Sequence, residues 1–137
     1  ESMRIDSREY FGLVCSQIRD ESRQDGIVLT VELEAEAIPL SLDVAVPLGL
    51  ILRELLNNAA VHGLGGRAEG QARVSFTLAG SRAELRVVDF GPGLGALGRG
   101  DGLGLTITKA LVRQLRGQLS FEDGQPGLVA RASFPLA

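Results

Sequence analysis

Apolar side chains recur along this chain at two spacings, which predict helices and strands in turn. Steps of three and four residues predict a helix that begins after Asp6, a central helix over residues 48–62 and a third over residues 105–116. Alternation predicts the strands, which are expected over residues 27–34, 72–78, 84–89, 118–122 and 128–134, with shorter ones at 3–5 and within 39–43. Three helices among these strands predict a single domain in which one mixed sheet carries the helices on one face.

The ends of the predicted helices carry residues that suit those positions. Asp6 is a good N-cap, and Glu9 follows at the spacing of a capping box. The first helix is expected to turn one side to the core, made of Tyr10, Leu13, Val14, Gln17 and Ile18. Pro47 suits the first turn of the central helix, where its missing N–H costs nothing. Gly63 and Gly117 are expected to end the second and third helices.

The central helix carries an apolar stripe and a separate polar row. The stripe is expected in the core and consists of Leu48, Ile51, Leu52, Leu55, Leu56 and Ala59. Glu54, Asn58 and His62 are four residues apart, so they lie above one another on consecutive turns of a different face. Such a row is compatible with plain solvent exposure or with a site built from a carboxylate, an amide oxygen and an imidazole.

Composition narrows the class of protein. The chain has 137 residues, 45% of them hydrophobic and 23% charged, with a formal net charge of −3, which argues against a general nucleic-acid surface. Cys15 is the one cysteine and His62 the one histidine, so an internal disulfide is excluded and a structural zinc site is disfavoured. Cys15 falls in an apolar helical pattern and is expected in the core. Charges interrupt the apolar runs short of a membrane span, and no secretory signal is recognisable, so a cytoplasmic location is expected.

Two glycine-bearing segments add candidate chemistry. Asp89 ends an apolar strand and is followed by Gly91 and Gly93, which permit close backbone approach to a ligand. A carboxylate there can accept a hydrogen bond from an exocyclic amine such as that of adenine, although many ordinary strand-ending turns look the same. Residues 100–106 place glycines directly ahead of a helix, where free N–H groups and the helix dipole suit phosphate oxygens. The spacing is neither that of a P-loop nor that of a Rossmann fingerprint.

Together the three segments resemble a known family. Glu54-x-x-x-Asn58-x-x-x-His62, Asp89-x-Gly91-x-Gly93 and Gly102-x-Gly104-Leu105 are similar, in order and spacing, to the N, G1 and G2 boxes of the Bergerat-fold ATPases. This superfamily includes gyrase, Hsp90-type chaperones, MutL-type repair proteins and histidine kinases. The flanking residues 47–55 and 111–117 look most like the catalytic and ATP-binding domain of sensor histidine kinases. The resemblance implies an α+β two-layer sandwich with a mostly antiparallel sheet of about five strands and three helices on one face.

The resemblance also implies roles for individual residues. Asn58 would supply an oxygen to Mg²⁺, and Glu54 would act as the catalytic group near the γ-phosphate of ATP. His62 would approach the phosphates or the ribose, and Asp89 would bind the adenine amino group. The remaining nucleotide-binding positions would approach the ligand through glycines or backbone amides; they are Gly91, Gly93, Gly102, Leu103, Gly104 and Leu105.

Four features depart from the family pattern. Val61 stands where a lysine is common, Phe90 where an asparagine is usual, and Leu128 follows Gly127 where a threonine is expected. The segment between the second and third boxes is also short. These departures bear on turnover more than on fold, and they leave open a weak or purely nucleotide-binding site.

Because His62 is the one histidine and belongs to the first box, a histidine acceptor is expected on a separate helical dimerisation domain, and through it a response regulator. Three hypotheses therefore follow. The chain is the ATP-binding domain of a histidine kinase, a stand-alone serine kinase of the anti-sigma-factor or switch type, or a degenerate Bergerat domain that serves as a docking module. Neither nucleic acid nor direct membrane contact is expected.

Overall fold

The computed structural model describes residues 3–62, 64, 67–91, 103–124 and 126–136. Within them the elements follow in the order β1 (Arg4–Asp6), α1 (Ser7–Gln24), β2 (Val28–Ala35), β3 (Pro39–Ser41), α2 (Leu42–His62), β4 (Glu69–Ala79), β5 (Arg82–Asp89), α4 (Leu103–Gln114), β6 (Gln118–Asp123) and β7 (Leu128–Pro135). The predicted helices and strands are all present in this order.

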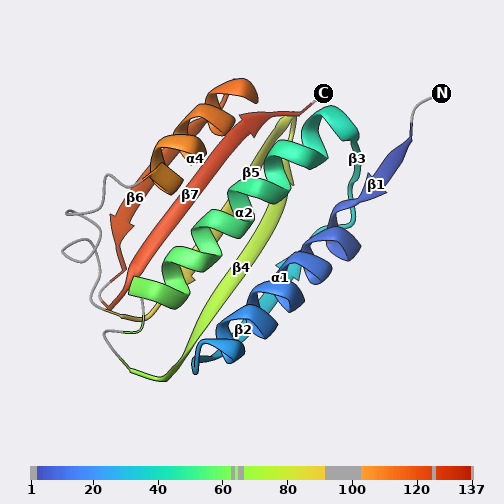
Figure 1. Ribbon diagram of the computed structural model, residues 1–137. Coiled ribbons are helices and arrows are strands. Elements are labelled where there is room, and N and C mark those ends of the chain that lie inside the picture. The colour runs from blue at the N-terminus through green and yellow to red at the C-terminus, as the bar shows by residue number, and fades with distance from the viewer. Residues whose placement is uncertain (1–2, 63, 65–66, 92–102, 125, 137) are drawn as a thin grey trace.

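Five strands form one mixed sheet in the order β2-β4-β5-β7-β6, and β1 pairs with β3 in a separate antiparallel ribbon. Among the described strands of the larger sheet, only β2 and β4 run parallel, because α2 lies between them in the chain and makes the crossover. Figure 1 shows α1, α2 and α4 on one face of this sheet. The two-layer α+β sandwich expected from the sequence is therefore confirmed. The short strand predicted at residues 3–5 is observed at Arg4–Asp6, in the separate ribbon.

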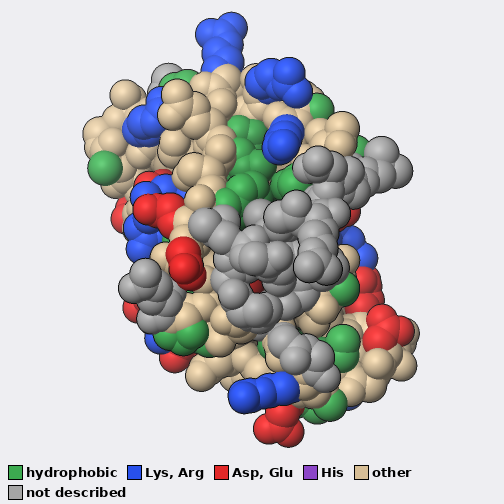
Figure 2. All heavy atoms as spheres, turned by 90° about the vertical axis from the view of Figure 1, so that its left-hand side faces the viewer, with side chains coloured by type: hydrophobic (Ala, Val, Ile, Leu, Met, Phe, Trp, Pro, Cys, Tyr) green, Lys and Arg blue, Asp and Glu red, His purple; other side chains and the backbone are tan. Residues whose placement is uncertain are grey.

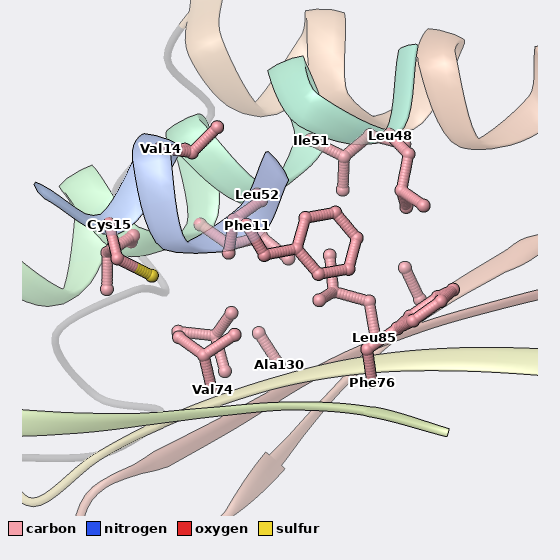
Figure 3. Close-up of a cluster of buried hydrophobic side chains, with 14 of the residues drawn as sticks. Phe11, Val14, Cys15, Leu48, Ile51, Leu52, Val74, Phe76, Leu85 and Ala130 are labelled. Carbon is pink, nitrogen blue, oxygen red and sulfur yellow. The ribbon is translucent and has the colours of Figure 1, made fainter. Parts of the chain in front are cut away.

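The core lies between the helices and the sheet (Figure 3). Phe11 of α1 meets Phe76 of β4 edge to face, with ring centroids 4.9 Å apart. All six residues predicted for the apolar stripe of the central helix are at most 3% exposed. Cys15 is also buried, and burial raises the pKa of its thiol to about 11, which keeps it protonated and unreactive.

The buried face of α1 differs from the predicted one. Asp6 caps the helix as expected, accepting hydrogen bonds from the backbone N–H groups of Arg8 and Glu9. However, Phe11 joins Val14, Ile18 and the expected Cys15 in the core, whereas Leu13 is 66% exposed and Gln17 is also exposed. The helix is rotated because the large Phe11 ring, rather than the Leu13 side chain, fits against Phe76.

Two helix ends also differ from the prediction. The helix α2 begins at Leu42, so Pro47 lies inside it rather than in its first turn. The ring removes the bond that an N–H at residue 47 would give to the carbonyl of residue 43, but the added turn buries Ala45 completely. At the end of α4 the left-handed residue is Arg116, with φ of 61°. Gly117 is needed for another reason, since a Cβ there would overlap the carbonyl oxygen of Ser133.

The apolar character of α2 comes from its place in the core. By length and composition alone, Leu42–Val61 would suffice to span a membrane, which the interrupted apolar runs in the sequence had not suggested. More than half of that stretch is buried inside the fold. The helix therefore packs its apolar surface against the sheet and against the neighbouring helices.

Candidate functional site

The polar row of α2 lies between the buried and the solvent-exposed sides of the helix. Glu54 and Asn58 are both half-buried, whereas the neighbouring Asn57 is exposed and Val61 is 56% exposed. This difference follows from the helical period, since residues 54 and 58 share a face while residue 57 turns to solvent. His62 is the last residue of α2, so its backbone continues the same row.

Asp89 is the buried acid of the candidate site. It is the last residue of β5, pairs with Ala72 of β4 and is 5% exposed. Its Oδ1 accepts hydrogen bonds from the N–H groups of Gly91, at 3.0 Å, and Leu128, at 3.1 Å. Burial raises the pKa of this carboxyl group, and the two hydrogen bonds oppose the shift without cancelling it. Both of these bonds, which come from described residues, end on Oδ1.

Gly127 fixes the same turn from the start of β7. Its φ is +91°, a conformation that side chains rarely allow. A Cβ there would overlap the carbonyl oxygen of Asp89 and lie 2.7 Å from the Cα of Phe90. In the sequence, Leu128 stood out only as a residue in the place of an expected threonine. The hydrogen bond from its N–H to Asp89 was not predictable, because a backbone donor leaves no trace in the pattern of residue types.

These parts meet at one edge of the molecule. The C-terminal end of α2, the end of β5 and the beginning of β7 lie together at the lower left of Figure 1. Figure 2 faces the same side of the molecule; the hollow with hydrophobic side chains, and the Lys or Arg side chains beside it, lie in the upper part of that view, above this edge. The fold therefore brings the first two predicted boxes to a common edge.

The third box is described only in part. Leu103, Gly104 and Leu105 form the first turn of α4, which begins two residues earlier than predicted, and Leu105 is 9% exposed. The N–H groups of a first turn have no partner within their own helix, which is why such amides commonly bind anions. Gly93 and Gly102 lie outside the described residues.

No ready-made metal cluster occurs in the described part of the chain, where no three His, Cys, Asp or Glu residues gather. Mg²⁺ often keeps several waters and binds through one or two protein oxygens together with substrate phosphates. A half-buried amide oxygen such as that of Asn58 fits this kind of coordination.

Comparison with known proteins places the chain among ATPases. The profile of the histidine kinase-, DNA gyrase B-, and HSP90-like ATPase family matches residues 43–137. Blue-light-activated histidine kinase 2 of Erythrobacter litoralis is 26% identical over 132 residues, which cover 93% of this chain and 38% of that protein. The chain thus spans well under half the length of this relative.

Solved structures share the fold. The histidine kinase domain of the Erythrobacter litoralis EL346 blue-light activated histidine kinase superposes with a TM-score of 0.83 at 24% identity, covering 96% of this chain and 62% of that one. The mycobacterial sensor histidine kinase MprB gives a TM-score of 0.75 at 24% identity, covering 98% and 97% of the two chains. With the family profile matching more than two thirds of the sequence, the chain belongs to the histidine kinase-, DNA gyrase B- and HSP90-like ATPase family.

Proposed function

We propose that this chain is the ATP-binding catalytic domain of a histidine kinase, which binds MgATP and passes the γ-phosphoryl group to a histidine on a separate helical dimerisation domain. The observation that carries the proposal is the Asp89 carboxyl group, which is buried at a strand end with Oδ1 satisfied by backbone amides. Such an oxygen pair can accept a hydrogen bond from the adenine amino group without moving.

The other residues of the candidate site contact different parts of the nucleotide in this proposal. In this proposal the Asn58 oxygen binds Mg²⁺, which neutralises phosphate charge, and Glu54, one turn earlier on α2, orients the acceptor near the γ-phosphate. His62 approaches the phosphates or the ribose. The phosphates lie against the amides of Leu103, Gly104 and Leu105, together with Gly102. Gly91 and Gly93 let the base come close to Asp89.

The partners and the location are part of the same proposal. The acceptor is the helical domain of the parent kinase, and a response regulator receives the phosphoryl group from it. We infer a cytoplasmic domain that contacts neither the membrane nor nucleic acid, in keeping with its small negative charge. The names of the relatives, which are histidine kinases, favour histidine over serine as the acceptor.

Calorimetry with a non-hydrolysable ATP analogue and Mg²⁺ tests the nucleotide site. Asn58→Ala should abolish Mg²⁺-dependent binding with little change in the unfolding temperature, because the side chain is half-exposed. Asn57→Ala is the matched control, since it removes the same amide from the exposed neighbouring position. Absence of binding by the wild-type chain at high micromolar concentration would instead favour a docking module.

Incubation with labelled ATP and the acceptor domain tests the reaction. A phosphoramidate on histidine is acid-labile, whereas a serine ester survives acid. An acid-stable product would overturn the histidine kinase proposal in favour of the serine kinase.

A further inference from the structure

Phe90 lies on the opposite side of the sheet from the candidate site. Phe90 directly follows Asp89, the last residue of β5, and is 41% exposed. Its ring lies against Arg73, which is exposed between the buried Ala72 and Val74 and therefore points away from the core. The guanidinium carbon of Arg73, on the neighbouring strand β4, lies 5.8 Å from the centre of the Phe90 ring. This is within the range of a cation–π contact.

Arg73 is itself held from the next strand. Its Nε donates a hydrogen bond of 2.8 Å to Oε1 of Glu32, and the two residues face each other in the parallel register of β2 and β4. The ion pair is exposed and adds little stability by itself. It does fix the direction of the guanidinium group, so that Glu32, Arg73 and Phe90 form one row across three adjacent segments. We call this row the outer brace.

The outer brace acts where the sheet no longer holds the chain on both sides. The last pair between β5 and β7 is Val88 with Val129, so Asp89 is paired on its β4 side and lies beyond the ladder with β7. The turn at residues 89–91 is then fixed by the hydrogen bonds from Gly91 and Leu128 to Asp89 and by the cation–π contact of Arg73 with Phe90. Without that contact, residue 90 gains conformational freedom that nucleotide binding would have to remove.

We propose that Arg73 and Phe90 are positioning residues for the adenine end of the nucleotide, acting through the Asp89 turn from the far face of the sheet. The inference rests on the proposed function, because it requires that Asp89 bind adenine. It also assigns a role to Phe90, one of the positions at which the sequence departs from the family pattern.

The test measures affinity for an ATP analogue and, separately, for inorganic triphosphate by calorimetry. Arg73→Gln keeps a donor for Glu32 but removes the cation, and Phe90→Leu removes the ring. Each should weaken the ATP analogue about two- to fivefold, the range expected for one exposed cation–π contact, and leave triphosphate unchanged. The double variant should be no weaker than either single variant, and Phe90→Tyr should bind like wild type.

Arg82→Gln is the matched control, since it removes an exposed arginine at the far end of β5 that bonds only the Ser133 hydroxyl in the described structure. If Asp89→Asn weakens ATP while Arg73→Gln and Phe90→Leu do not, the outer brace is overturned and the proposed function stands. Equal loss for ATP and triphosphate in the Arg73 and Phe90 variants would also overturn it, since general loosening would explain that result. A wild-type chain that binds no nucleotide would overturn both.

Discussion

The replacement of Asp89 by asparagine separates the ligand role of this residue from its structural role. Asparagine has the same shape, so its Oδ1 can keep the two backbone hydrogen bonds from Gly91 and Leu128. The second oxygen becomes an NH₂ group, which donates and therefore faces the donating amino group of adenine. The variant should fold like wild type while losing its affinity for the base.

The structure sets the size of this effect. A hydrogen bond to a charged group contributes about 1.5–3 kcal/mol, which corresponds to about ten- to hundredfold in affinity. Because Asp89 is only 5% exposed, water cannot readily replace the lost acceptor, and the upper part of this range applies. The unfolding temperature should stay the same or rise slightly, since burial penalises the charge that the substitution removes.

Calorimetry with a non-hydrolysable ATP analogue and Mg²⁺, repeated with inorganic triphosphate, separates the affinity that comes from adenine from the affinity that comes from the phosphates. The variant should lose affinity for the analogue and keep its affinity for triphosphate. Equal losses for the two ligands, or no loss for the analogue, would refute the assignment of adenine to Asp89. A marked fall in the unfolding temperature would refute the claim that asparagine preserves the turn.

Three further predictions follow from the same edge of the molecule. Gly127→Ala should lower the free energy of unfolding in urea by at least about 1–3 kcal/mol and weaken ATP binding. The φ of residue 127 is positive, and the added Cβ would overlap the backbone carbonyl oxygen of Asp89, which cannot move aside as a flexible side chain could; wild-type stability would contradict this. Val61→Lys should raise ATP affinity about two- to fivefold at unchanged stability, the scale of one exposed charge pair, and no change would mean that residue 61 does not face phosphate. The folded chain holds the Asp89 proton more tightly than the unfolded chain, because burial raises the pKa of this carboxyl group. As pH rises from the ordinary carboxyl pKa to the raised one, wild type should therefore lose stability relative to Asp89→Asn. A free energy of unfolding that changes with pH in the same way for both proteins across the acid range would refute the raised pKa.

Local periodicity was sufficient to predict most of the fold. The strands and the buried stripe of α2 follow from alternation and from three- and four-residue steps, because burial on one face imposes these periods directly. The rotation of α1 was not predictable in this way. Both Phe11 and Leu13 are compatible with its pattern, and Phe76, distant in the chain, decides between them. The early start of α2 is likewise a tertiary effect, since burial of Ala45 outweighs the interior proline.

The candidate site was predictable as residue types but not as contacts. Asp89 and the glycines were visible in the sequence because their order and spacing, together with those of the other two segments, resemble the boxes of a known family. The hydrogen bond from Leu128 to Asp89 joins residues 39 positions apart through a backbone group. The contact between Arg73 and Phe90 depends on the pairing of β4 with β5, which residue types alone do not specify.

The parallel pairing of β2 with β4 has a consequence for how the molecule fluctuates. The antiparallel neighbours β4–β5 and β6–β7 are joined by short turns and can form early, whereas β2 must wait until the whole of α2 has closed the loop between Val28 and Glu69. We expect the N-terminal helix and β2 to open as one unit ahead of the rest, with the earliest amide exchange in the sheet. Since Glu32 belongs to that unit, each such opening would release Arg73 from its ion pair. Nucleotide affinity would then be coupled to the opening of β2, a strand that supplies none of the proposed ligand contacts.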